Sequence, residues 1–283
     1  MKPEWLKIQR RTSEQYSRVK HMIEQHALNT ICSSGKCPNQ FECWNRGTAT
    51  FMILGNICTR NCKFCATITG KPLPPDSNEP QRIAESVAKL NLRHTVITSV
   101  TRDDLPDQGA QQWCDCIKAI REINPKTTIE VLTPDFNGDK ALIDKIVSAQ
   151  PDIISHNLET VERLTPLTRS RATYRMSLRV LTMMSESGIP TKTGIMVGLG
   201  ESKAEVAQTL QDAYQAGCRI ITIGQYLQPT KSNLPVAEYV HPSIFAHYHH
   251  IAREIGFEHA VCGPLVRSSY HAEDTIAHNA KNQ

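Results

Sequence analysis

Strand-like and helix-like segments alternate along this chain after Gly47. Six apolar runs have strand length and carry β-branched residues; they are TATFMILG (48–55), HTVITSV (94–100), TTIEVLTPD (127–135), DIISHNLET (152–160), PTKTGIMVGLG (190–200) and RIITIGQY (219–226). Segments with apolar residues three and four apart lie between and after them, at 81–92, 110–123, 138–149, 172–187, 203–216 and 242–256. The alternation predicts parallel strands joined by right-handed helical crossovers.

The number of units sets the fold class. Six strand-helix units are present, with a seventh apolar stretch, FEHAVCG (257–263), whereas a complete TIM barrel has eight units. We therefore expect an α/β fold, a partial (β/α)6 TIM-like barrel, with a doubly wound sheet as the alternative. Residues 48–256 are expected to form the barrel, residues 1–47 an N-terminal helical extension and residues 257–283 a short C-terminal segment.

Composition excludes several classes of protein. No apolar run approaches the roughly 20 residues of a membrane helix, and the first residues lack the pattern of a secretory signal. We expect a soluble, cytoplasmic monomer, or an organellar matrix protein if a transit peptide was removed. The net charge of +4 comes without a basic run, and aromatic residues make up only 6% of the chain, so nucleic-acid binding is not expected.

The cysteines are clustered. Six of the ten lie between positions 32 and 65, and in a reducing compartment such a cluster indicates metal ligands or catalytic groups instead of disulfides. Cys58, Cys62 and Cys65 follow the first strand, where the loops of a parallel barrel build active sites. A structural zinc ion normally has four protein ligands, whereas a four-iron four-sulfur cluster bound by three cysteines keeps one iron open. A zinc site completed by a distant His or Cys is the alternative.

A family resemblance is carried by this loop. The stretch CTRNCKFC (58–65) resembles the cysteine loop of the radical S-adenosylmethionine (radical SAM) superfamily, with Phe64 as the aromatic residue before the last cysteine. The resemblance implies that S-adenosylmethionine chelates the open iron and is cleaved reductively to a 5′-deoxyadenosyl radical, which takes hydrogen from an unactivated carbon. It also implies an incomplete six-unit barrel.

A second cysteine triple lies upstream. Cys32, Cys37 and Cys43 have the spacing C-x4-C-x5-C, and two nonequivalent triples, each lacking a fourth ligand, imply two clusters with different roles. The order of both triples resembles the lipoyl synthase family from about residue 2 to 272. Further matching motifs are KPEWLK, GTATFMILG, VITSVTRDD, HNLET, TKTGIMVGLGE, GQYLQP and CGPLVRSSYHA.

This resemblance implies a specific chemistry. The upstream cysteines and one serine of the R-S-S-Y motif, Ser268 or Ser269, would hold an auxiliary four-iron cluster that donates its sulfur; we favour Ser269, the residue before Tyr270. A hard alkoxide is a poor partner for sulfide-rich iron, which suits a cluster that is consumed. The implied reaction inserts two sulfur atoms, at C6 and C8 of an octanoyl chain bound to a lysine of a carrier. The implied partners are an octanoylated lipoyl domain or H-protein as substrate and a small electron-transfer protein of the ferredoxin or flavodoxin type.

Five further residues are candidate contacts of the S-adenosylmethionine. Asn157 and Glu159 alternate with Leu158 at the end of a strand and therefore face one side, where the resemblance places the ribose or amino acid part of the cofactor. Lys192 begins the next strand and is a candidate partner of the cofactor carboxylate. Ser99 and Asp103 are candidates for its amino group.

Other notable residues have ordinary explanations. GLGE (198–201) lacks the third glycine of a dinucleotide fingerprint, so a tight turn or a close approach to the adenosyl group is expected. Arg267 is expected either to hold substrate or cluster or to form a salt bridge. We expect surface histidines at His247, His249 and His250, and ordinary thiols at Cys114, Cys116, Cys218 and Cys262.

The two cysteine triples lead to a prediction of metal content. After anaerobic reconstitution, each chain is expected to hold about eight irons with equivalent sulfide, because two four-iron clusters have separate ligand sets. Iron and sulfide analysis with visible absorbance measures this content. A colourless protein that takes up zinc instead would contradict it.

Overall fold

One mostly parallel sheet dominates the structure, a computed structural model that describes residues 2–8, 11–270 and 272. Its strand order follows the sequence, being β1 (Asn29–Thr30), β2 (Thr50–Ile53), β5 (His94–Ser99), β6 (Thr128–Leu132), β7 (Ile153–Ser155), β8 (Thr191–Val197), β9 (Ile220–Gln225) and β10 (His259–Gly263). Strands β2 to β10 run parallel, and only β1 pairs antiparallel, with β2. A doubly wound sheet reverses its strand order in the middle, so this sequential order confirms the partial barrel.

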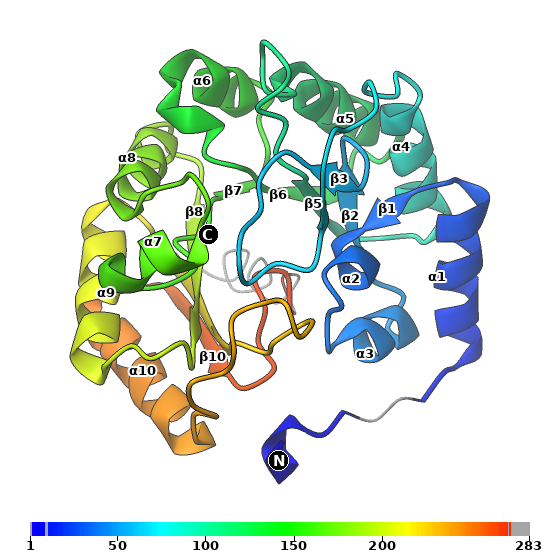
Figure 1. Ribbon diagram of the computed structural model, residues 1–283. Helices are drawn as coiled ribbons and strands as arrows, with labels where there is room; N and C mark the ends of the chain where they lie inside the picture. Colours follow the sequence, from blue (N-terminus) through cyan, green and yellow to red (C-terminus); the bar gives the residue numbers. More distant parts are fainter. Residues whose placement is uncertain (1, 9–10, 271, 273–283) are drawn as a thin grey trace.

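Helices cover the outside of the curved sheet (Figure 1). The six crossover helices are α4 (Glu79–Lys89), α5 (Ala110–Ile123), α6 (Lys140–Ser148), α8 (Tyr174–Ser185), α9 (Lys203–Gln215) and α10 (Pro242–Ile255). Each buries an apolar stripe; Trp113 and Ile120 of α5, for example, are completely buried. Shorter turns lie in the connections: η2 (Phe136–Gly138), η3 (Glu162–Leu164) and α7 (Thr165–Thr168). Within the described ranges, none of the helices has the length and apolar character of a membrane span.

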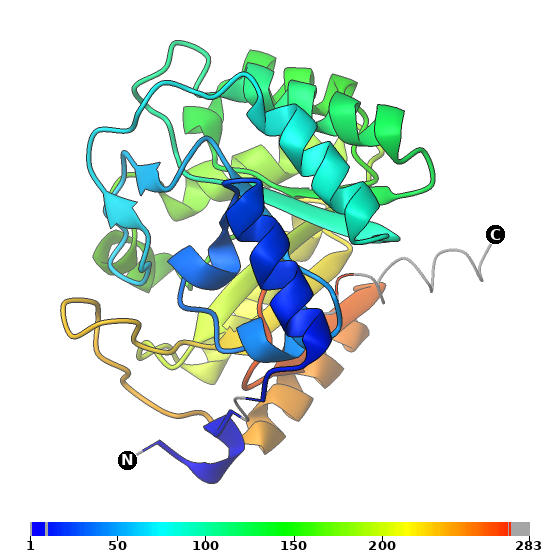
Figure 2. The ribbon, with the colours of Figure 1, turned by 90° about the vertical axis from the view of Figure 1, so that its right-hand side faces the viewer.

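The flanking segments join the barrel. The N-terminal segment is helical, as expected, with η1 (Glu4–Leu6), α1 (Glu14–Gln25), α2 (Ile31–Ser34) and α3 (Gln40–Asn45). It lies along one edge of the barrel (Figures 1 and 2). It also contributes β1, and the C-terminal segment contributes β10 to the opposite edge of the sheet. Backbone hydrogen bonds thus cross both expected domain boundaries, at 47/48 and at 256/257. The division of the chain at these positions remains a prediction.

A two-stranded ribbon, which the sequence analysis did not predict, brackets the first cysteine loop. Its strands are β3 (Ile57–Cys58) and β4 (Ile68–Thr69), and Cys58 is paired with Thr69. The strands are too short to show an apolar alternation in the sequence. The ribbon fixes the two ends of the loop that carries Cys58, Cys62 and Cys65.

A buried ion pair lies inside the barrel. Lys192 Nζ is 2.8 Å from Glu130 Oε1, and the two side chains are 2% and 0% exposed. His94 Nε2 lies 3.7 Å from the other carboxylate oxygen. Burial by itself would raise the pKa of Glu130, but the charges of Lys192 and His94 outweigh it and hold this pKa below its ordinary value. One carboxylate oxygen thus faces the ammonium of Lys192 and the other the imidazole of His94.

The pair leads to a stability prediction. Glu130→Gln is expected to lower the free energy of unfolding by about 3–5 kcal/mol, because it leaves the Lys192 charge buried without a counter-charge. Chemical denaturation measures the change. The control is Asp144→Asn, which removes the partner of Lys140 in a pair that is about half exposed, and it is expected to have a far smaller effect. Equal effects of the two substitutions would show that the buried pair has no special weight.

Candidate functional site

Two adjoining cavities lie within the barrel and at its rim. The larger has a volume of about 570 Å³ and the smaller about 170 Å³. The larger falls in the range of small-molecule sites. Four residues that the sequence analysis singled out line both cavities, namely Phe64, Cys65, Asn157 and Glu159. The cavities therefore meet at the predicted cofactor contacts.

The first cysteine triple lines the smaller cavity. Cys58, Cys62 and Cys65 all contribute to its wall. The backbone N–H groups of Arg60 and Thr101 each donate to Cys58 Sγ at 3.4 Å, and a further backbone N–H donates to Cys65 Sγ at 3.4 Å. Such N–H···S contacts stabilise thiolates and tune the potential of an iron-sulfur cluster. Burial, and then the neighbouring Cys62 and Cys58, raise the pKa of Cys65.

Arg60, inside the cysteine loop, anchors that loop to the barrel rim. Its guanidinium is 4% exposed and forms two hydrogen bonds of 2.8 Å with Asp103, one of 2.8 Å with Asp135 and one of 2.9 Å with Asn137. Although burial raises the pKa of Asp135, the hydrogen bond from Arg60, the nearby His156 and the charge of Arg60 lower it to about 2. Asp103 lines neither cavity, so this placement does not favour its predicted contact with the cofactor amino group.

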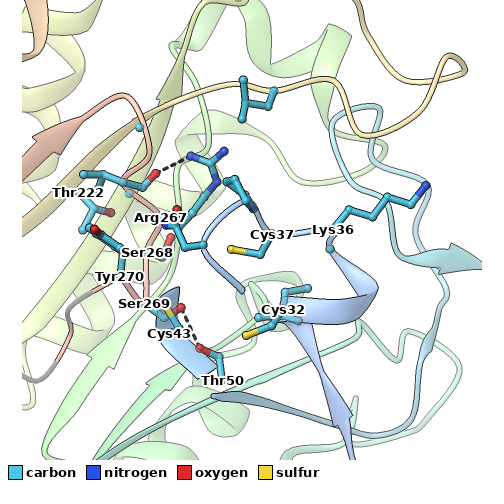
Figure 3. Close-up of a pocket in the computed structure, with 18 of the residues that line it drawn as sticks. Cys32, Lys36, Cys37, Cys43, Thr50, Thr222, Arg267, Ser268, Ser269 and Tyr270 are labelled. Carbon is cyan, nitrogen blue, oxygen red and sulfur yellow. Dashed lines mark hydrogen bonds between the residues drawn. The ribbon is translucent and has the colours of Figure 1, made fainter. Parts of the chain in front are cut away.

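The second cysteine triple lines the larger cavity. Cys32 comes from α2, Cys43 from α3 and Cys37 from the segment between them. The thiols of Cys32 and Cys37 point into one space, opposite Arg267 and the two serines that follow it (Figure 3). Burial and the nearby Cys37 raise the pKa of Cys32 to about 11. Burial also raises the pKa of Cys37, against the opposing charge of Arg267.

The two serines of the R-S-S-Y motif have different partners. Ser268 Oγ accepts a hydrogen bond from Asn157 Nδ2 at 2.7 Å. Ser269 Oγ accepts one from Thr50 Oγ1 at 2.9 Å (Figure 3). Ser268 is thus turned to the predicted cofactor contacts. Both serines line the cavity of Cys32, Cys37 and Cys43, and Ser269 as a ligand remains a prediction.

Two glycines that the sequence analysis missed allow residues 266–269, which we call the serine segment, to approach strands β8 and β9. A Cβ on Gly224 would lie 2.0 Å from the carbonyl oxygen of Val266. A Cβ on Gly194 would lie 2.6 Å from Thr222 Oγ1, 3.0 Å from Asn157 Oδ1 and 3.1 Å from Ser268 Oγ. A glycine within a predicted strand was the available signal, since it often marks a close approach of backbone.

Asn157 and Glu159 lie where the cavities meet. The buried Asn157 Oδ1 has no hydrogen-bond partner among the described residues, so it is available to a ligand. Glu159 has a φ of +69°, and hydrogen bonds with Gly194 and Met196 on β8 hold this strained backbone. Burial raises the pKa of Glu159 and the charge of Arg169 opposes the shift.

Arg169 is a functional candidate that the sequence analysis missed. It lines the smaller cavity, and its Nη1 donates to Ser177 Oγ at 2.8 Å and to the Asn157 carbonyl at 3.2 Å. No sequence motif marks it, because only the fold brings it to the cysteine loop. Lys192 lines neither cavity and is paired with Glu130, so its placement does not favour a cofactor contact. Ser99 does line the smaller cavity, and its buried Oγ has no partner among the described residues.

The remaining predictions are of ordinary structural roles. Glu201 accepts hydrogen bonds from the N–H groups of Gly198 and Leu199, so GLGE forms the expected tight turn. The three histidines of α10 are exposed, as expected. The four remaining cysteines are buried or half-buried, also as expected: Cys114, Cys116, Cys218 and Cys262.

The donor sets fit iron-sulfur clusters better than single metal ions. In the described part of the chain, no three His, Cys, Asp or Glu side chains are grouped to hold one ion. The thiolates of a four-iron cluster bind different irons and surround a larger body. Two separate thiol triples, one with N–H donors to sulfur, match that requirement.

Comparison with known proteins identifies the class. The sequence profile of the Radical SAM superfamily matches residues 52–213. Among solved structures, the fold resembles HydG, a maturase of the [FeFe]-hydrogenase, with a TM-score of 0.56 and 15% identity over 95% of this chain and 65% of that chain. It also resembles methylornithine synthase, with a TM-score of 0.55 and 11% identity over 87% and 81% of the two chains. The chain belongs to the radical SAM superfamily.

Full-length relatives narrow the assignment. The chain is 57% identical to a lipoyl synthase of Bacteroides fragilis (strain YCH46), covering 99% of this chain and 97% of the relative. It is 57% identical to one of Parabacteroides distasonis, over 97% and 98% of the two chains, and 55% identical to one of Treponema denticola, over 97% and 95%. Within the superfamily, the chain belongs to the lipoyl synthase family.

The anchoring by Arg60 leads to a prediction. Arg60→Ala removes the buried cation that Asp103 and Asp135 share, so the free energy of unfolding is expected to fall by about 3–5 kcal/mol. The reconstituted protein is expected to retain about four irons instead of about eight, because the first cysteine loop loosens. Denaturation and iron analysis after gel filtration measure both effects. Arg171→Ala is the control, since Arg171 contacts Asp103 at 3.3 Å but is 59% exposed; equal iron loss in both variants would contradict the role of Arg60.

Proposed function

We propose a division of labour between the two cysteine triples of this lipoyl synthase. Membership of the family makes the chain a radical SAM enzyme that inserts sulfur, with two four-iron four-sulfur clusters and S-adenosylmethionine as cofactors and an octanoylated carrier as substrate. The proposed ligands of the cluster that binds S-adenosylmethionine are Cys58, Cys62 and Cys65. The proposed ligands of the auxiliary, sulfur-donating cluster are Cys32, Cys37, Cys43 and Ser269.

One observation carries this proposal: the triples line two cavities that share part of their walls. When bound, the cofactors supply a 5′-deoxyadenosyl radical for hydrogen abstraction and sulfur for insertion at C6 and C8 of the octanoyl chain. The chain's own task is to hold both centres against one substrate carbon at a time and to exclude water. Phe64 and the hydrogen bond between Asn157 and Ser268 lie where the two cavities meet.

The smaller cavity supplies complementary groups for the amino acid and ribose parts of S-adenosylmethionine. We assign the carboxylate of the cofactor to Arg169, which lines this cavity beside Asn157. Arg60 lines it too, but its guanidinium is already paired with Asp103 and Asp135. Asn157 Oδ1 accepts a hydrogen bond from the cofactor, because it is buried and otherwise unpaired. Ser99 Oγ and the Glu159 carboxylate are the further polar contacts, and Phe64 packs at the junction of the cavities.

The larger cavity suits a flexible apolar arm. Val96, Leu132 and Ile195 form part of its wall, and the segments 35–41 and 226–229 border it. An octanoyl-lysine arm enters there while its carrier, a lipoyl domain or H-protein, stays outside. We further propose that the enzyme is a cytoplasmic monomer and that a small ferredoxin or flavodoxin reduces it. In this proposal residues 1–47 are the unit that carries the auxiliary-cluster cysteines.

Substitution of one cysteine from each triple separates the two roles. Cys58→Ala is expected to abolish reductive cleavage of S-adenosylmethionine, because it removes a ligand of the cluster that binds the cofactor. Cys37→Ala is expected to permit cleavage and to prevent lipoyl formation. Chromatography of 5′-deoxyadenosine and mass spectrometry of an octanoylated carrier measure the two steps.

The control is Cys114→Ala on the outer helix α5, which is expected to keep both steps. Cleavage by Cys58→Ala would overturn the first assignment. Lipoyl product from Cys37→Ala would overturn the second.

A further inference from the structure

A basic and apolar surface lies over the first cysteine loop. We call it the α7 face and define it by the exposed residues Lys63, Leu167, Arg171 and Lys231. Leu167 is 63% exposed, and the Arg171 side chain is 59% exposed. None of the four lines either cavity, so the assigned site does not account for them.

Three segments distant in the sequence meet at this face. The Lys63 N–H donates to the carbonyl of Thr168 at 2.8 Å, which joins the cysteine loop to α7. Asn233 Nδ2 donates to the Lys63 carbonyl at 3.1 Å, which joins the loop to the segment that carries Lys231. The face is therefore built on hydrogen bonds of the cluster-binding loop itself.

Cys62 is the ligand candidate whose thiol contact at this face is exposed. Its Sγ lies 3.9 Å from Ser170 Oγ, and this contact is solvent-exposed. The hydrogen bonds of Cys58 and Cys65, by contrast, are partly buried. An electron that enters through Cys62 thus crosses the least protein.

Positive charge at the α7 face is not compensated locally. Among the described residues, Lys63 and Lys231 form no ion pair, and Arg171 reaches only Asp103, which is buried and already paired with Arg60. In the stretch 162–175, Arg163 is paired with Glu205 and Arg175 with Glu162. Arg169 lines the smaller cavity, so Arg171 is the arginine of this stretch that adds charge to the face. The face therefore presents a net positive charge around one exposed leucine.

We propose that the α7 face is the docking site of a small electron-transfer protein with an acidic surface. The inference rests on the proposed function, in which Cys62 ligates the cluster that must be reduced. Electron transfer slows steeply with distance, so the donor must dock where the cluster lies nearest the surface. Redox partners bind through small interfaces that opposite charges steer, and a basic rim around one apolar contact has that character.

The α7 face and the larger cavity are neighbours. None of the four residues that define the face lines that cavity, but Gln228 on its border donates to the carbonyl of Asn233, which contacts Lys63. The binding of the carrier is therefore measured separately from that of the donor.

Binding tests the proposal without turnover. The probe is an oxidised bacterial flavodoxin, and its Kd for the anaerobically reconstituted protein is measured by calorimetry at low and high salt. Leu167→Asp and Lys231→Glu are each expected to weaken binding about tenfold or more at low salt, with a smaller difference at high salt. The control, Lys118→Glu on the outer helix α5, is expected to bind within about twofold of the parent. Unchanged Kd values in both face variants would overturn the proposal.

Rates then separate docking from chemistry. With reduced flavodoxin, both face variants are expected to form 5′-deoxyadenosine about tenfold more slowly than the parent, and with dithionite at the parental rate. Equal slowing with both reductants by both variants would place the defect in the cluster loop and overturn the docking role. The docking role would also be overturned if both face variants lost affinity for an octanoylated carrier and still bound flavodoxin like the parent. That result would assign the face to the substrate. If the parent forms no 5′-deoxyadenosine with dithionite, the proposed function fails, while the Kd values still decide the docking site.

Discussion

The buried guanidinium of Arg60 is the interaction on which the first cysteine loop depends. It lies between Asp103 and Asp135, which follow two neighbouring parallel strands. Because the carboxyl ends of parallel strands reach the same rim, one cation between Cys58 and Cys62 ties the loop to both connections. A charge buried this deeply is tolerated only with ideal partners, and the same requirement makes the position of the loop unique.

The two cavities of the site are joined by contacts between residues that belong to neither cysteine triple. Asn157 bonds to Ser268, and Gly194 leaves room for both side chains beside Thr222. The serine segment thus rests on the strand that follows the candidate cofactor contacts. This arrangement places the proposed sulfur source and the proposed radical source on opposite sides of one hydrogen bond, where a single acyl arm can meet both.

Charge is distributed according to depth. The Glu130–Lys192 pair is fully buried within the barrel, Arg169 lines the smaller cavity, and the cations of the α7 face remain in solvent. Each setting changes what a cation does: it compensates a carboxylate in the interior, it offers a site to a small anion in a cavity, and it attracts a macromolecule at the surface.

The sequence by itself determined the partial barrel, because strand and helix periods are local properties that survive without tertiary information. The spacing of Cys58, Cys62 and Cys65 and of Cys32, Cys37 and Cys43 likewise predicted two open ligand sets, since the loop length between ligands is covalent. The placement of Arg169, Lys192, Asp103 and the R-S-S-Y serines was decided only by the tertiary structure. Which cation faces a cavity and which is paired in the core depends on contacts between residues tens of positions apart, and on the desolvation that those contacts impose.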